Sequence, residues 1–437
     1  MVLTALNGGS KPEEGTVAER RDRYARINRM SRRDFLRRSA GAALAVPSMA
    51  AILAACSKPT PTGGDGSPLP SSIPIATRDN PVTLPLRGQP VATDAPVEEG
   101  TLQIYNWIDY MWKQVLNDWG TQADRDWEYT TFNTMAEAES KLASGKVKPD
   151  VFFPTIDKLP TEVYAGLLQP LNHELLPNIA DDWAQFSGTD SPWYDQGWRY
   201  TVPYTVYTTG IAYRKDHISE DEVNEKGYDI FWDPQYKGKV GIYDDYREAL
   251  GMAMMRRGVT DINTGDPKII DQAKNDLIDL IDTVSVRTTI NGAYAKLPDD
   301  EFWIHQSWSG DIIGSQWYLP KGVSTDVLGF YQDEIFPIGN DLIAVPADAE
   351  HPAMAHNFMN YLISSKPATK NFSWNGYQPP LNSMDPETLV KDGYVPESVG
   401  NAVVGSEDFE NGLWATFLPP EIDDLWQSAW DEFRAGG

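Results

Sequence analysis

The sequence predicts an α/β fold with two lobes. Short apolar strands alternate with helical segments from residue 101 onward, which is typical of a parallel sheet covered by helices. The chain has 437 residues, 41% of them apolar and 11% aromatic, so it can bury more core than one small domain needs. A segment rich in β-branched and aromatic residues, 200–213, suits strands that pass between lobes. The simplest arrangement is two α/β lobes with a cleft between them.

The first part of the folded body is expected to contain three strands and two helices. These are strands at 102–105, 127–132 and 150–153, a helix over 111–119, and a helix that ends at Gly145. Gly120 should stop the first helix, and Thr134 with Glu137 forms a capping box at the start of the second. Because the strands alternate with helices, they should lie parallel in one sheet.

Later segments continue this pattern. A turn at 237–238 precedes a strand at 239–243, and a helix over 246–257 starts with acidic and ends with basic residues. A strand at 341–345 is followed by a helix that Pro367 prevents from continuing. The apolar face of that helix comprises Met354, Phe358, Tyr361 and Leu362.

The charge balance argues against a nucleic-acid partner. The net charge is −26, and outside the basic first 55 residues the chain holds 27 basic and 58 acidic residues. Such a surplus repels a phosphate backbone. It attracts cations, although solubility or adaptation to salt accounts equally well for most of these charges.

The sequence lacks the patterns of bond-making chemistry. Cys56 is the single cysteine, so neither an intramolecular disulfide nor a thiolate metal cluster can form. Among the five histidines, His351 and His356 lie five apart without a matching pattern of carboxylates or cysteines. Nucleophile elbow, phosphate-binding loop and dinucleotide fingerprint are missing as well. We therefore expect no enzyme, no metal and no cofactor.

The first 55 residues have the features of an export signal. Residues 31–38 read Ser-Arg-Arg-Asp-Phe-Leu-Arg-Arg, and the mildly apolar stretch 40–55 ends in Leu-Ala-Ala before Cys56. This looks like a twin-arginine signal joined to a lipobox, and a basic helix start is the alternative. A run of about 16 residues is too short for a membrane span. Cleavage before Cys56 would allow lipidation there.

The lipid chains would anchor the exported protein to the outer face of the cytoplasmic membrane, in the periplasm or at the cell surface. Residues 56–100 are rich in Pro, Gly, Ser and Thr and show no apolar periodicity. We therefore expect a flexible spacer between the anchor and the folded body.

Polar and aromatic residues gather after the first predicted strand. Trp107 and Asp109 lie there, and ligands in open α/β sheets bind beyond the carboxyl ends of strands. An indole face binds a cation with about 0.5 kcal/mol when exposed and about 2 when dry. The structural alternative is a core tryptophan, with Asp109 as the cap of the next helix.

Other carboxylates and aromatic rings allow the same two interpretations. Asp245 and Glu248 fit a capping pair that needs no ligand, yet the helix dipole would also keep them ionised for pairing with an ammonium group. The remaining candidates are Trp308 with Asp311 around a glycine, Asp341 at the start of a strand, and Tyr377 in a turn. Each could be purely structural.

From residue 101 to 437 the chain resembles the spermidine and putrescine substrate-binding proteins of ABC importers. The resemblance rests on motifs in the same order: Tyr105-Asn106-Trp107 with Tyr110, Trp232-Asp233-Pro234 through Tyr236-Lys237-Gly238, Asp244-Asp245-x-Arg247-Glu248, Trp308-Ser309-Gly310-Asp311, and Gly376-Tyr377. It implies the type II two-lobed periplasmic binding protein fold, an α/β fold with a ligand cleft between the lobes.

The resemblance also implies a set of binding residues. The aromatic walls for the ligand's methylenes would be Trp107, Trp308 and Tyr377. The counter-ions of its amines would be Asp109, Glu248, Asp311 and Asp341, with Asp245 at an acidic position that spermidine binders use. Tyr110 belongs to the first motif, and Thr155 stands where the family often has a serine that hydrogen-bonds the ligand.

The sequence departs from the family pattern at three places. Ile156 and Asp157 follow Thr155 where an aromatic residue is usual. Gly339 stands where spermidine binders carry a tryptophan, and Ala415 replaces an amide side chain. These departures concern which amine is bound, while the class of ligand stays an elongated organic cation.

The implied organisation is a signal peptide (1–55), a linker (56–100), a first lobe (101–206 with 340–385) and a second lobe (207–339 with 386–437). The implied partners of this monomer are a polyamine or similar small organic cation and the permease subunits of an importer. Two alternatives stay open: a two-lobed receptor for another small ligand, and a surface lipoprotein that senses or scaffolds without transport.

Overall fold

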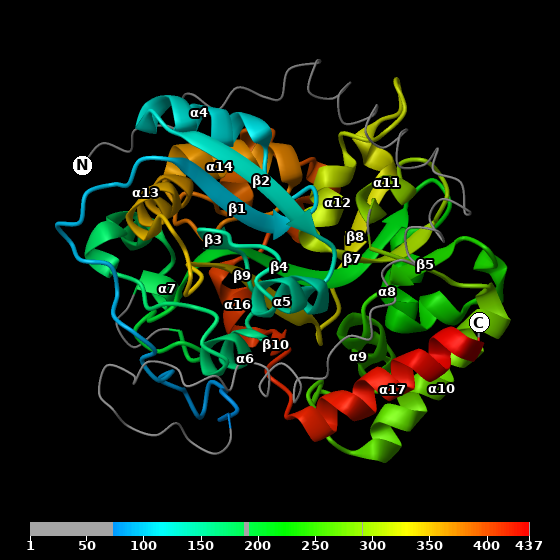
Figure 1. Cartoon of the computed structure of the whole chain (residues 1–437). Helices are drawn as coiled ribbons and strands as arrows, with labels where there is room; N and C mark the ends of the chain where they lie inside the picture. Colours follow the sequence, from blue (N-terminus) through cyan, green and yellow to red (C-terminus); the bar gives the residue numbers. More distant parts are fainter. Residues whose placement is uncertain (1–72, 188–191, 291, 437) are drawn as a thin grey trace.

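The computed structural model describes residues 73–187, 192–290 and 292–436. The predicted signal peptide, Cys56 and the first part of the predicted spacer lie outside these residues. The described chain forms two α/β halves that share one ten-stranded sheet (Figure 1).

The first half of the sheet holds the strands that come earliest in the chain. In spatial order they are β2 (Asp126–Phe132), β1 (Thr101–Trp107), β3 (Val151–Phe152), β9 (Pro337–Ala344) and the first part of β4 (Thr201–Arg214), with β10 (Leu413–Trp414) beside β9. β1, β2 and β3 are parallel, as the alternation of strands and helices predicted. β9 runs antiparallel to β3 and β4 and parallel to β10.

The second half continues from the other end of β4. Its strands are β7 (Ile304–Trp308), β5 (Val240–Tyr243) and β6 (Arg287–Thr289), with β8 (Leu328–Tyr331) also paired to β4. β5 is parallel to β6 and β7, whereas β4 is antiparallel to β7 and β8. The predicted strand at 239–243 is therefore confirmed as β5.

Helices cover both faces of the sheet. Those of the first half are α4 (Lys113–Ala123), α5 (Met135–Ala143), α6 (Leu159–Tyr164), α7 (Ala184–Ser187), α13 (Pro352–Leu362) and α16 (Ser406–Asn411). Those of the second half are α8 (Glu220–Lys226), α9 (Tyr246–Arg256), α10 (Pro267–Val284), α11 (Ala293–Lys296), α12 (Ser309–Ser315), α15 (Pro386–Lys391) and α17 (Pro420–Gly436). α14 (Ser365–Asn375) contacts α4 and α13 of the first half and α12 of the second.

β4 joins the two halves. Residues 201–208 pair with β9, and residues 209–214 pair with β7 or β8. The ladder shifts register between Pro203 and Thr205, since proline has no N–H to donate. All 14 residues of β4 are buried except Tyr207, which is partly exposed. The prediction that 200–213 passes between two lobes is confirmed.

Each half has apolar clusters on both faces of its sheet, as expected for a covered parallel sheet. In the second half, α9, α10 and α17 pack on one face, and α12 with Phe330 packs on the other. In the first half, Phe153 faces α4 and α13, whereas Phe152 faces the cluster around Trp183. Phe409 and Trp414, which the predicted bounds assign to the second lobe, belong to that same first-half cluster.

Two expected helix ends are wrong. α4 continues through Gly120 and ends before Asp124, whose φ is 54°. A Cβ at Gly120 would lie 2.8 Å from the carbonyl oxygen of Arg125, so this glycine permits close packing instead of stopping the helix. Pro367 lies in the first turn of α14, where its missing N–H leaves no intrahelical bond unmade.

The predicted flexible spacer is wrong from residue 73 onward. Ala76, Val82 and Leu84 are buried in the same apolar cluster as Tyr200. The Tyr200 hydroxyl hydrogen-bonds to the backbone at residues 85 and 87, at 2.6 Å each. The Glu98 carboxylate accepts from two N–H groups at the start of α13. The polar composition hid these few anchoring residues, because three apolar side chains do not make a periodic pattern.

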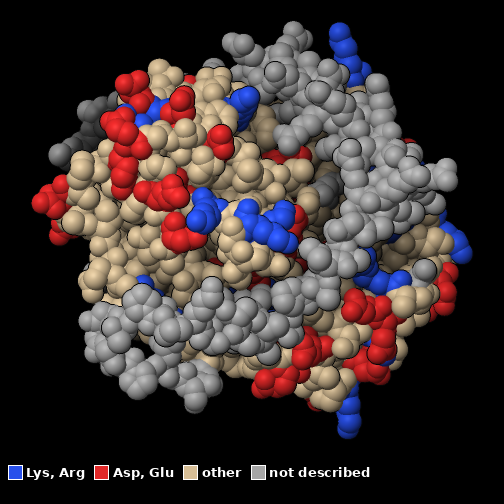
Figure 2. All heavy atoms as spheres, in the orientation of Figure 1, with Lys and Arg blue, Asp and Glu red and all other residues tan. Residues whose placement is uncertain are grey.

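Acidic side chains gather over α4 and over α17 on the face drawn in Figure 2. α17 carries five carboxylates and one arginine. Among the helices of the described residues, none is both long enough and apolar enough to cross a membrane.

The packing of the 73–100 segment predicts a contrast between two leucines. Leu84 is 0% exposed and Leu86 is 43% exposed. Leu84→Ala should lower the free energy of unfolding by about 2 to 5 kcal/mol, because it leaves a cavity in the core. Leu86→Ala, the matched control, should change it by less than about 0.5 kcal/mol. Urea unfolding of both variants measures the difference, and equal effects would show that the segment does not pack on the body.

Candidate functional site

Carboxylates and aromatic rings from both halves meet where β4 crosses between them. The segments that supply them are the loop after β1, the middle of β4, the start of α9, the end of β7 with the start of α12, the middle of β9, and the turn after α14. We call this set of side chains the crossing site.

Glu248 and Trp308 form its second-half side. Asp245 caps α9 by accepting from two backbone N–H groups of the first turn, at 2.9 and 3.1 Å, and thereby fixes the position of Glu248. The Trp308 indole donates to Glu248 Oε1 at 2.7 Å, and the Thr209 hydroxyl donates to the same oxygen at 3.2 Å. The indole also stacks on Tyr243 with 3.9 Å between ring centroids. The two carboxylates therefore differ in role: Asp245 caps the helix, as the structural interpretation predicted, and Glu248 is bonded to an aromatic side chain of the site.

Asp311 is held by two phenols. It is buried in the first turn of α12, and its carboxylate accepts from the hydroxyls of Tyr243 and Tyr377 at 2.8 Å each. A Cβ at Gly310 would lie 2.5 Å from the Tyr377 ring, so this glycine makes room for the ring. Gly376, with a φ of 83°, ends α14 in the left-handed conformation that glycine adopts readily and so orients Tyr377.

Asp341 extends the crossing site into the first half. Its carboxylate accepts from the Tyr110 hydroxyl at 2.6 Å, and its backbone forms an isolated bridge with Thr155. The Thr155 hydroxyl donates to Asp157 at 2.6 Å. The Tyr110 ring meets the Tyr377 ring edge to face at 4.8 Å. A continuous set of contacts therefore runs from Thr155 to Asp311.

Tyr207 is a residue that the sequence analysis missed. Its ring lies 6.1 Å from the ring of Trp308 and 6.4 Å from that of Tyr377. It therefore links the Glu248 side of the crossing site to the Asp341 side. A signal was available in the sequence, because Gly339 removes an expected aromatic side chain and Tyr207 is a large residue on the segment predicted to cross between the lobes.

Eight of the ten predicted binding residues share these contacts. They are Tyr110, Thr155, Asp245, Glu248, Trp308, Asp311, Asp341 and Tyr377. The Trp107 indole instead donates to the carbonyl of Phe153 and packs on Phe132, and the residue stays partly exposed. Asp109 accepts from the Tyr294 hydroxyl of α11 at 2.7 Å and does not cap α4, whose N-cap is Trp112.

Burial changes the acidity of the crossing site. It raises the pKa of Glu248 to about 7, with the negative charge of Asp245 adding to the effect. It raises the pKa of Asp341 to about 7 and that of Asp311 to about 6. Arg247 donates to Asn263 and to backbone carbonyls rather than to these carboxylates. A bound cation would oppose the raised pKa values, because positive charge favours the ionised form.

A second acidic group lies nearby and connects the halves. Lys158, just before α6, lies 3.4 Å from the hydroxyl of Tyr246 in α9 and 3.6 Å from the carboxylate of Asp157. The Tyr246 hydroxyl donates to Asp423 of α17 at 2.6 Å. Burial raises the pKa of the neighbouring Glu139 to about 7.

Within the described residues no group of three or more possible ligand side chains is arranged to hold a metal ion.

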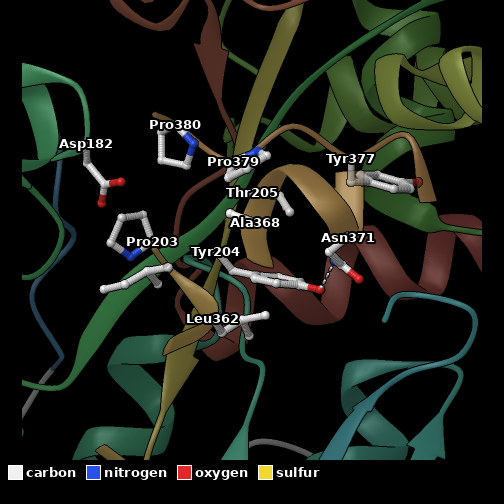
Figure 3. Close-up of a pocket in the computed structure, with 11 residues that line it drawn as sticks. Asp182, Pro203, Tyr204, Thr205, Leu362, Ala368, Asn371, Tyr377, Pro379 and Pro380 are labelled. Atoms are coloured by element: carbon white, nitrogen blue, oxygen red, sulfur yellow. Dashed lines mark hydrogen bonds between the residues drawn. The ribbon is translucent and has the colours of Figure 1, made fainter. Parts of the chain in front are cut away.

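The cavity in Figure 3 is too small for an organic ligand. It has a volume of about 10 Å³ and is lined by Tyr204, Thr205, Asn371 and Tyr377 among others. That volume admits about one water molecule. Asn371 donates to the Tyr204 hydroxyl at 2.9 Å beside it (Figure 3). We therefore regard this cavity as packing behind the site and not as the place of a ligand.

The raised pKa of Glu248 predicts how stability depends on pH. The folded protein keeps a proton on Glu248 between its ordinary pKa near 4.5 and about 7, whereas the unfolded chain loses it. Folding stability should therefore fall as pH rises through that window. Glu248→Gln should fall less steeply than wild type in urea unfolding at pH 5, 6 and 7. Glu128→Gln, on the exposed edge of β2, is the control and should match wild type. Identical slopes for wild type and Glu248→Gln would contradict the prediction.

Comparison with known proteins places the chain in a family. Residues 121–396 match the model of the bacterial extracellular solute-binding proteins. The spermidine/putrescine-binding periplasmic protein of Escherichia coli is 25% identical over 353 residues, which cover 78% of this chain and 93% of the relative. The spermidine/putrescine-binding periplasmic protein 1 of Haemophilus influenzae is 26% identical over 352 residues, with 75% and 92% covered.

Solved structures agree on the fold. The TpPotD lipoprotein of Treponema pallidum aligns over 76% of this chain and 99% of its own, with a TM-score of 0.64 and 18% identity. Together with the family match, this likeness confirms the predicted two-lobed periplasmic binding protein fold. Because the family match spans more than half of the chain, the protein belongs to the bacterial extracellular solute-binding proteins.

Proposed function

We propose that this protein binds a polyamine of the putrescine or spermidine class outside the cytoplasm and delivers it to an ABC importer. One observation carries the proposal. Glu248 on one half and Asp341 on the other lie around the same group of aromatic rings, formed by Trp308, Tyr207 and Tyr377.

A polyamine needs both kinds of group at once. Its methylenes gain from apolar walls, and each ammonium needs an ionised partner to offset the loss of water. The carboxylates of the crossing site accept from phenol, indole and threonine donors, which are neutral and leave the negative charge uncompensated. A cation with a slender apolar chain therefore matches the site better than a sugar, which would leave several carboxylates in a dry cleft without a counter-charge.

The curated relatives support the ligand class. The two proteins compared above are named for binding spermidine and putrescine. At 25% and 26% identity they support the class of ligand better than any single amine.

Transport requires that the lobes open and close. The lobes of this proposal are 101–206 with 340–385 and 207–339 with 386–437, except that residues 406–414 pack on the first lobe. Lys158 with Tyr246, and Asp109 with Tyr294, join the two halves and would form on closure. The closed form would then present the permease subunits with a surface that the open form lacks. No catalytic step is part of this proposal.

Two substitutions test the ligand site. Trp308→Ala or Glu248→Gln should weaken binding of putrescine and spermidine at least tenfold, about 1.4 kcal/mol, without unfolding the protein. Trp303→Ala is the matched control, because Trp303 lies just before β7 and stacks on His217. Titration calorimetry with each amine gives the affinities, and circular dichroism checks the fold.

Two results would contradict this assignment. Unchanged affinity in both variants would remove the crossing site as the binding site. If wild type shows no thermal shift with either amine but shifts with choline, a sugar or ferric ion, the ligand class is wrong. A ligand at 100 times its Kd should add about 2.7 kcal/mol of stability, which such a screen detects.

We also propose that the mature protein is a lipoprotein exported through the twin-arginine pathway and anchored at Cys56. The support is the sequence alone: Arg32 and Arg33, the apolar stretch, and Leu-Ala-Ala before the only cysteine. Packing of residues 73–100 on the body leaves residues 57–72 to connect the body to the anchor.

Substitutions in the leader test this export route in a bacterium that has the twin-arginine pathway. Cys56→Ser should abolish incorporation of labelled palmitate, since the acylated thiol is lost. Replacing Arg32 and Arg33 by lysine should keep the protein in the cytoplasm, whereas the same change at Arg37 and Arg38 should not. Palmitate incorporation into Cys56→Ser would rule out this anchor.

A further inference from the structure

Tyr207 holds a position unlike any other on β4. The strand is buried along its length, and Val206 and Thr208, its neighbours, are each 1% exposed. Only Tyr207 is partly exposed. A large phenol at that position faces the space between the halves and not a core.

The ring of Tyr207 depends on Gly339. The two residues are direct partners in the antiparallel pairing of β4 and β9. A Cβ at Gly339 would lie 2.5 Å from Cζ of Tyr207 and 2.6 Å from its hydroxyl oxygen. The backbone of Gly339 does not lie in the left-handed region, so its conformation is open to any residue. The glycine therefore leaves space for the ring: a side chain at position 339 would displace Tyr207 from its present position.

The other surroundings of Tyr207 are groups of the crossing site. Trp308 and Tyr377 flank its ring at steep angles, 63° and 81°, so its face is not covered by stacking on either of them. Burial raises the pKa of the Tyr207 hydroxyl well above 10, and the charges of Asp341 and Glu248 add to this effect. The hydroxyl thus stays protonated, and it interacts electrostatically with carboxylates of both halves.

We infer that Tyr207, admitted by Gly339, is a specificity-determining residue of the crossing site, whose ring contacts the methylenes of a bound polyamine and whose hydroxyl accepts a hydrogen bond from an ammonium. This inference rests on the proposed function. In this inference the aromatic wall comes from β4, the strand that both lobes share. Without Tyr207, a side chain on β9 would have to provide it.

A double-mutant cycle tests the inference, with Tyr207→Gly, Gly339→Ala and the pair measured for spermidine and putrescine by titration calorimetry. Tyr207→Gly should weaken binding at least about tenfold, because the ring is lost. Gly339→Ala should weaken binding several-fold in the wild-type background, because the new methyl group displaces the ring. In the Tyr207→Gly background the same change should alter affinity less than about twofold, since the ring is already gone.

Two further variants separate ring, hydroxyl and general effects of the substitutions. Tyr207→Phe should retain most of the affinity for both amines and lose only the contribution of the hydroxyl. Gly251→Ala in α9 is the control for adding a methyl group, because a Cβ there meets nothing within 4 Å. Its affinity for both amines should equal that of wild type. The midpoint of thermal unfolding, measured for every variant, shows whether the fold is kept.

The outcomes distinguish this inference from the function on which it rests. If wild type binds neither amine, the proposed function and the inference both fail. If wild type binds the amines and both Tyr207→Gly and Tyr207→Phe bind them as tightly as wild type does, only the inference fails. If Gly339→Ala weakens binding equally with and without the Tyr207 ring, the two residues act independently, and the role assigned to Gly339 is overturned.

Discussion

The hydrogen bonding of β4 to two different sets of strands is the constraint on which the arrangement depends. Residues 201–208 pair with β9 in the first half, and residues 209–214 pair with β7 and β8 in the second. One extended segment thereby belongs to both halves of the sheet. Tyr207 lies near the junction of these two ladders and is the residue of β4 that is partly exposed.

The second constraint is the cost of negative charge in a poorly hydrated gap. Glu248, Asp311 and Asp341 are each held by hydroxyl or indole donors, and burial raises their pKa values toward neutrality. Neutral donors orient a carboxylate without cancelling its charge. A guanidinium at the same place would have stabilised the empty protein and weakened its interaction with a cation. Under the proposed function, some stability of the ligand-free protein is therefore given up for the recognition of positive charge.

Glycines shape this site by allowing close approach rather than by flexibility. Gly310 accepts the ring of Tyr377, and Gly339 accepts the ring of Tyr207. Both rings lie against backbone where any Cβ would collide with them. Either of the paired strands β4 and β9 can thus supply an aromatic side chain at this place, provided that the residue paired with it is small. The residue at position 339 alone does not show which of the two strands does so.

The sequence by itself determined the α/β class, most strands and helices, the capping of α9 by Asp245, and the kinds of residue that gather at the site. These features depend on local periodicity, turn residues and caps, which act over a few neighbouring positions. It misjudged Gly120 and Pro367, whose roles depend on packing and on the start of the next helix. It also took residues 73–100 for a spacer, because a few apolar residues anchor them across long separations in the chain.

Only the tertiary structure decided which candidates meet. It joined Glu248 to Trp308 and Asp341 to Tyr110, bonded the Trp107 indole to Phe153 and Asp109 to Tyr294 of α11, and added Tyr207. The physical reason is that these contacts join residues far apart in the chain. Their geometry depends on strand register and on the space that one small residue leaves for a large one, and local sequence patterns record neither.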